Sequence, residues 1–62
     1  MKMVIEKIEE IEIIEMTTSD GKVYRRYSEY DWCRYVFCEE RMVSISMDEE
    51  LEQIYQKHLL NK

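Results

Sequence analysis

Apolar residues recur along this chain at two different periods, and the two periods predict two kinds of structure. Toward the C-terminus they return every third or fourth position, the spacing that places side chains on one face of a helix. The residues of this stripe are Met47, Leu51, Ile54, Tyr55, His58 and Leu59. We therefore expect a helix over residues 47–60, docked through that face. Ser46 and Glu49 have the spacing of a capping box at its start.

Earlier in the chain the alternation has the period of two that is typical of strands. Asp20-Gly21 predicts a tight hairpin turn, because glycine accepts the positive φ that a two-residue turn requires. We expect strands over 8–18 and 22–29, with a bulge where Ile13-Ile14 interrupts the alternation. Residues 2–7 fit either a continuation of the first strand or a helical turn.

Residues 30–46 connect these two parts. The segment 42–46, MVSIS, alternates and predicts a short strand. Residues 30–41 are rich in types that favour strands, although Ser28 and Asp31 are spaced to open a helix; we favour the strand. The expected fold class is α+β: a small antiparallel sheet of three to four strands with one C-terminal helix packed on one face. One glycine and no proline leave no linker, so residues 1–62 form a single domain.

The net charge of −5 narrows the classes of partner. Acidic residues concentrate in the first twenty positions and at the start of the expected helix, and the middle of the chain is mildly basic. This balance argues against general affinity for nucleic acid or for anionic lipid, both of which require cations. No apolar run approaches 18 residues and no signal peptide is evident, so we expect no membrane span and a cytoplasmic location.

The residues that could carry catalysis or bind a metal are few. Cys33 and Cys38 are five positions apart, and neither a helix nor a strand brings such a pair together. His58 lies alone on another element, so four zinc ligands cannot be assembled. We expect buried, unreactive thiols, no metal and no cofactor. Because nucleophilic catalysis needs a nucleophile, a base and an orienting group in mutual reach, we do not expect an enzyme.

A basic, aromatic ribbon follows the hairpin turn. Lys22, Arg25 and Arg26, interleaved with Tyr24 and Tyr27, have the composition of a strand that binds single-stranded nucleic acid by stacking and phosphate contact. The competing interpretation is that Arg25 and Arg26 pair across the hairpin with acids of the preceding strand. We favour this second interpretation, because those acids lie at the right cross-strand distance. The acids are Glu10, Glu12 and Glu15.

Two surfaces are candidates for binding a partner protein. Runs of acids are usually only a solvated face, but here the fold can gather those of the first strand and of the helix start on one side. Such a face would compete for a cleft built for nucleic acid. The strands are also apolar on both faces while one helix covers only one, and aromatic residues are typical of binding hot spots. The predicted acidic face is Glu9, Glu10, Glu12, Glu15, Glu39 and Glu40. The predicted aromatic face is Tyr24, Tyr27, Tyr30, Trp32, Tyr35 and Phe37.

In composition and expected architecture the chain resembles the small acidic inhibitors that phages make against host enzymes, uracil-DNA glycosylase inhibitors and anti-CRISPR proteins among them. No motif corresponds residue by residue, so no functional residue is transferred. The expected function is a non-enzymatic binding protein of the phage or mobile-element type that occludes a host enzyme or nucleic-acid-binding complex by mimicking nucleic acid. The alternatives are a homodimeric regulator that binds nucleic acid through the basic hairpin strand, and an antitoxin-like partner protein.

Overall fold

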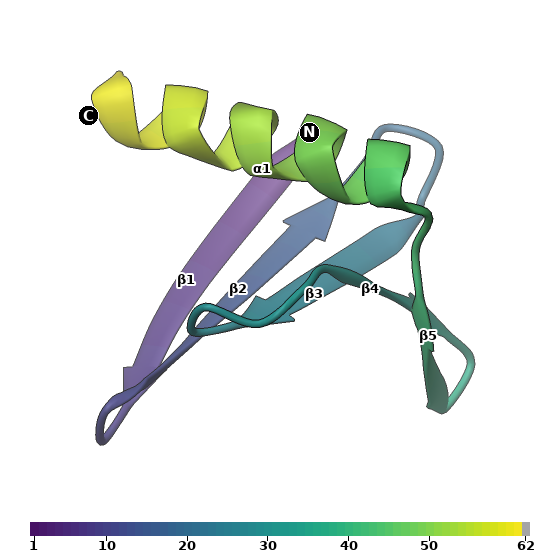
Figure 1. Cartoon of the computed structure of the whole chain (residues 1–62), viewed down its shortest axis with the longest axis horizontal. Helices are drawn as coiled ribbons and strands as arrows, with labels where there is room; N and C mark the ends of the chain where they lie inside the picture. The colour runs from purple at the N-terminus through teal and green to yellow at the C-terminus, as the bar shows by residue number, and fades with distance from the viewer. Residues whose placement is uncertain (62) are drawn as a thin grey trace.

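A computed structural model describes residues 1–61, which form one antiparallel sheet crossed by one helix (Figure 1). The strands neighbour one another in chain order, so each consecutive pair is a hairpin. The α+β class and the C-terminal helix are confirmed, but the sheet has five strands instead of three to four. The elements are β1 (Lys2–Ile8), β2 (Ile11–Thr17), β3 (Val23–Tyr27), β4 (Cys33–Val36), β5 (Glu39–Met42) and α1 (Ile45–Leu60).

The first hairpin settles the open question about residues 2–7, which are strand. β1 pairs with β2 without interruption, from Lys2 opposite Thr17 to Ile8 opposite Ile11. The chain therefore turns at residues 9–10, and the strand expected over 8–18 begins only at residue 11. The bulge expected at Ile13-Ile14 is wrong, because both pairings of β2 are continuous there. The two isoleucines therefore face opposite sides of the sheet, Ile14 in the core and Ile13 on the other face beside Glu15 and Arg25.

The hairpin expected at Asp20-Gly21 is present, with a longer loop than two residues. Residues 18–22 join β2 to β3, and Gly21 has φ +85°. Its N–H donates to the carbonyl of Thr18 over 3.0 Å, and the Thr18 N–H donates to the carbonyl of Lys22 over 2.9 Å. Glycine is favoured at this position because a Cβ would oppose the positive φ.

Residues 30–46 depart furthest from expectation. The strand favoured over 30–41 is broken by a turn at residues 37–38, where Phe37 has φ +58°. The strand expected over 42–46 is wrong, because β5 ends at Met42 and α1 begins at Ile45. The cause is Ser44, whose Oγ accepts the N–H of Met47 over 3.2 Å and so caps the helix two residues before the expected capping box at Ser46.

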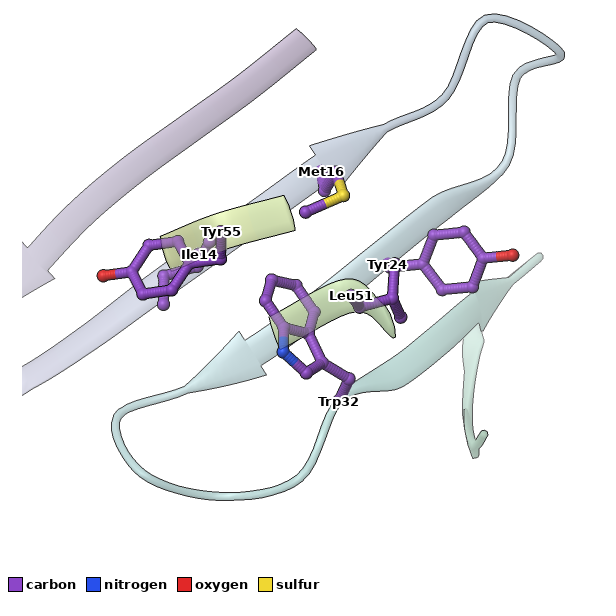
Figure 2. Packing of buried hydrophobic residues seen from close by; sticks show 6 residues of the cluster. All are labelled: Ile14, Met16, Tyr24, Trp32, Leu51 and Tyr55. Atoms are coloured by element: carbon purple, nitrogen blue, oxygen red, sulfur yellow. The ribbon is translucent and has the colours of Figure 1, made fainter. Parts of the chain in front are cut away.

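The core lies between α1 and one face of the sheet (Figure 2). Leu51 and Tyr55 of α1 lie against Ile14 and Met16 of β2, as the helical stripe predicts. Tyr24 of β3 extends this layer. Trp32, between β3 and β4, is 1% exposed and meets Tyr55 edge to face with ring centroids 6.3 Å apart. In the part of the chain that the structure describes, no helix covers the opposite face of the sheet.

Candidate functional site

A groove of about 670 Å³ lies between α1, the 28–32 loop and the end of the first hairpin. Six carboxylates line it against two cations, Lys7 and Arg26. Its volume is in the range of small-molecule sites, but those are lined mainly by apolar side chains. The excess of negative charge suits a cationic surface better. The six residues of this acidic groove are Glu10, Glu12, Glu29, Asp31, Asp48 and Glu52.

Three of the six, which we call the floor carboxylates, hold the fold together. Glu12 accepts a hydrogen bond from the Tyr55 hydroxyl over 2.8 Å. Asp48 accepts the backbone N–H of Trp32 over 2.6 Å, and Glu52 accepts its indole N–H over 3.1 Å. Burial, and next the bond to Glu12, raise the pKa of Tyr55. The floor carboxylates therefore fix α1 and Trp32 to the sheet.

Arg26 lies beneath the groove as a buried cation. The residue is 8% exposed, and its guanidinium carbon is 4.9 Å from the ring centroid of Tyr55 and 5.6 Å from that of Trp32. One terminal nitrogen donates to the carbonyl of Ser28. Nε lies 3.2 Å from Glu52 Oε2 in an ion pair, although its N–H is not aligned for a hydrogen bond. Glu52 is thus the counter-ion of a cation that water barely reaches.

The other three, which we call the rim carboxylates, are exposed: Glu10, Glu29 and Asp31. Within residues 1–61 none of their side chains makes a hydrogen bond or an ion pair. Tyr30 lies between two of them in sequence and is 75% exposed. The rim carboxylates therefore make no side-chain contact of this kind within residues 1–61, and they are exposed to a binding partner.

The six residues predicted as an acidic face do not share one surface. Glu10 and Glu12 line the groove, and Glu9 lies in the adjoining turn with φ +58°. Glu15 points to the uncovered face of the sheet, where it pairs with Arg25. The last two are on β5, where Glu39 pairs with Arg41 and Glu40 accepts the Tyr27 hydroxyl. That bond to Glu40, and next burial, raise the pKa of Tyr27.

The predicted aromatic residues are divided as well. Tyr24 and Trp32 belong to the core. Tyr27 and Tyr35 are half-buried on the uncovered face, where the Arg25 guanidinium lies 4.1 Å from the Tyr35 ring centroid. The other two stand apart from both faces, Tyr30 at the groove and Phe37, 91% exposed, in the 37–38 turn.

Each basic residue of the hairpin ribbon has an acidic neighbour. Arg25 Nε donates to Glu15 over 2.9 Å, the cross-strand pair that the sequence predicts. Arg26 pairs with Glu52 of α1 instead of an acid of the hairpin. Lys22 Nζ lies 3.6 Å from Asp20, whose pKa is lowered first by its hydrogen bond from Thr18. The ribbon's positive charge is therefore matched within the fold.

The cysteines are free and lie in different environments. Cys33 is half-buried on β4, and its burial raises the pKa of the thiol. Cys38 is exposed in the 37–38 turn, so the expectation of two buried thiols is wrong for it. Over residues 1–61 no three side chains of the metal-binding types are placed to share an ion. In the same range, no helix has the length and apolar character needed to cross a bilayer.

Sequence reasoning missed Glu29 and Asp31, and it grouped Glu12 with residues of the opposite face. Strand alternation was the available signal, because Glu12, Ile14 and Met16 share a face once Ile14 is known to be buried. The contribution of the 28–32 loop has no such signal. No protein-family model matches the chain, and no curated protein or solved structure shows significant similarity to it.

Proposed function

We propose that this protein is a non-enzymatic binding protein whose acidic groove occupies a basic surface on a partner protein. The partner is a host enzyme or complex that binds nucleic acid, and binding blocks its cleft in the way a nucleic-acid mimic would. This mode of action is that of a phage- or mobile-element-type inhibitor. The observation that carries the proposal is the division of the groove into floor and rim carboxylates.

The rim carboxylates support the proposal because, within residues 1–61, none of them makes an ion pair. A cleft that binds nucleic acid presents lysines and arginines to phosphates, and carboxylates in a matching position attract the same cations. Glu10, Glu29 and Asp31 come from two separate loops that meet at one groove. The floor carboxylates accept hydrogen bonds from Trp32 and Tyr55 and so hold the two loops in fixed positions relative to each other. Little conformational entropy is therefore lost when a partner binds.

The composition of the groove lining supports the non-enzymatic part of the proposal. Within residues 1–61 that lining contains no histidine and no cysteine, the usual general base and the most reactive nucleophile. The alternative of direct nucleic-acid binding has less support, because Lys22, Arg25 and Arg26 are each paired with a carboxylate. Freeing them would break contacts that the fold already makes.

The proposal is tested by capturing partners of the tagged protein from a bacterial lysate, with and without nuclease treatment, and identifying them by mass spectrometry. We expect one stoichiometric protein partner that survives nuclease and dissociates as salt is raised, because exposed charges are screened. Recovery of nucleic acid, or of proteins lost on nuclease treatment, would favour the basic hairpin strand instead.

A further inference from the structure

The outer edge of β1 is a long unpaired strand edge. β1 spans seven residues and contains no proline. Among residues 1–61 it pairs with β2 alone, and Figure 1 shows it at the end of the sheet. In an antiparallel strand, alternate residues direct their backbone N–H and C=O groups away from the paired neighbour. Such an edge is a template for another strand unless proline, a bulge, a covering segment or charged side chains block it, and the charges of β1 make its pairing depend on register.

We propose that β1 pairs with β1 of a second copy of this chain, antiparallel and about a two-fold axis at Val4. In this register Val4 lies opposite its own copy, and Met3 lies opposite Ile5 of the second copy. Lys2 lies opposite Glu6 of the second copy. By symmetry the last two pairs occur twice, so the seam contains two ion pairs, two apolar pairs and one central pair.

The sequence of β1 selects this register over its neighbours. With the axis at Ile5, Lys2 would face an isoleucine and Glu6 would face Val4, so no charge would meet its opposite. With the axis at Glu6, two like charges would be directly opposed, which is destabilising. Of these three registers, only the axis at Val4 matches charge with charge and apolar with apolar over residues 2–6, and Lys7 then lies opposite Met1 of the second copy.

The burial pattern of β1 agrees with such a seam. Met3 and Ile5 already pack against the core beneath α1, so their counterparts across the axis would continue that layer. Val4 is on the uncovered face and is 37% exposed. An axis perpendicular to the sheet keeps both helices on one side. The product is a ten-stranded sheet, formed without the rim carboxylates, and the inference therefore does not rest on the proposed function.

Charge reversal tests the register directly. Sedimentation velocity over a range of concentrations should give a species of twice the 7.7 kDa chain mass. We expect Lys2→Glu alone, and Glu6→Lys alone, to raise the dimer dissociation constant about ten- to a hundredfold, because two favourable pairs become repulsive. The double variant should restore dimerisation. Arg41→Glu, on the opposite edge of the sheet, is the control and should leave the dimer unchanged.

Disulfide cross-linking gives a second, independent readout. In a background carrying Cys33→Ser and Cys38→Ser, Val4→Cys should form a covalent dimer on mild oxidation, because opposed Cα atoms lie about 5 Å apart. Glu6→Cys, on the same face and edge, should not, since its two copies would be about 14 Å apart along the seam. A protein that stays monomeric at all concentrations, or a dimer that cross-links through position 6, would overturn the proposal.

Discussion

The ion pair beneath the groove makes a quantitative prediction. Replacing Glu52 with alanine removes the counter-ion of Arg26 and the acceptor of the Trp32 indole N–H. Breaking a fully buried ion pair costs about 3–5 kcal/mol, and the side chain of Glu52 is 36% exposed, so we expect roughly half of that. The lost hydrogen bond to a charged acceptor adds about 1–2 kcal/mol, and the expected total is about 2.5–4.5 kcal/mol.

That loss is large for a chain of 62 residues, whose whole unfolding free energy is expected at about 3–9 kcal/mol. It corresponds to a fall in Tm of at least about 10 °C. Trp32 is the only tryptophan and is buried, so its fluorescence reports urea or thermal unfolding directly. Glu52→Gln should lie between wild type and Glu52→Ala, because it keeps an acceptor for the indole.

The matched control is Glu50→Ala, which removes the same charge from an exposed position of the same helix. We expect it to change stability by less than about 0.5 kcal/mol. Arg26→Met should cost less in the Glu52→Ala background than in wild type, since the buried charge is then already unpaired. Equal destabilisation by Glu52→Ala and Glu50→Ala would refute the assignment of Glu52 as a buried counter-ion.

Two further predictions concern the 37–38 turn and the Tyr55 hydroxyl. Phe37→Asn should raise the free energy of unfolding by about 0.5–1 kcal/mol, because asparagine tolerates the φ of +58°. Little packing is lost, because the Phe37 ring is 91% exposed. A lower free energy of unfolding in urea would mean that the ring packs against the fold. The raised pKa of Tyr55 favours its neutral form in the fold, so its contribution is complete below the ordinary value of 10.0 and is lost as pH rises beyond it. Urea unfolding in alkaline buffers should therefore show a smaller fall for Tyr55→Phe than for wild type, and identical falls would contradict this.

Local patterns predicted much of the fold. The helix was evident because Leu51 and Tyr55 recur at helical spacing, and the second hairpin because Gly21 permits a positive φ. The turn at residues 37–38 was missed since Phe37 has no preference for turns and adopts its positive φ only in the context of the hairpin. The helix start was misplaced by two residues because Ser44 and Ser46 are both suitable caps, and geometry alone decides between them.

The candidate site was harder to predict because it depends on contacts between distant segments. Arg26 and Glu52 are separated in sequence by the whole of β4 and β5 and by about half of α1, and no local signal pairs them. Glu15 and Glu12 look alike in the sequence, yet strand alternation sends one to the uncovered face and the other to the groove. Acidic composition predicted that a negative surface exists, and only the register shows which residues form it.

The most direct test of the acidic groove is a comparison of two variants that carry the same change in net charge. One replaces the rim carboxylates, Glu10→Gln, Glu29→Gln and Asp31→Asn, and the other replaces three exposed acids elsewhere, Glu39→Gln, Glu49→Gln and Glu50→Gln. Both variants should keep the wild-type free energy of unfolding in urea to within about 1 kcal/mol. Quantitative capture from a nuclease-treated lysate should show a partner that the second variant retains and the first loses. Equal retention by both variants would contradict binding through the groove.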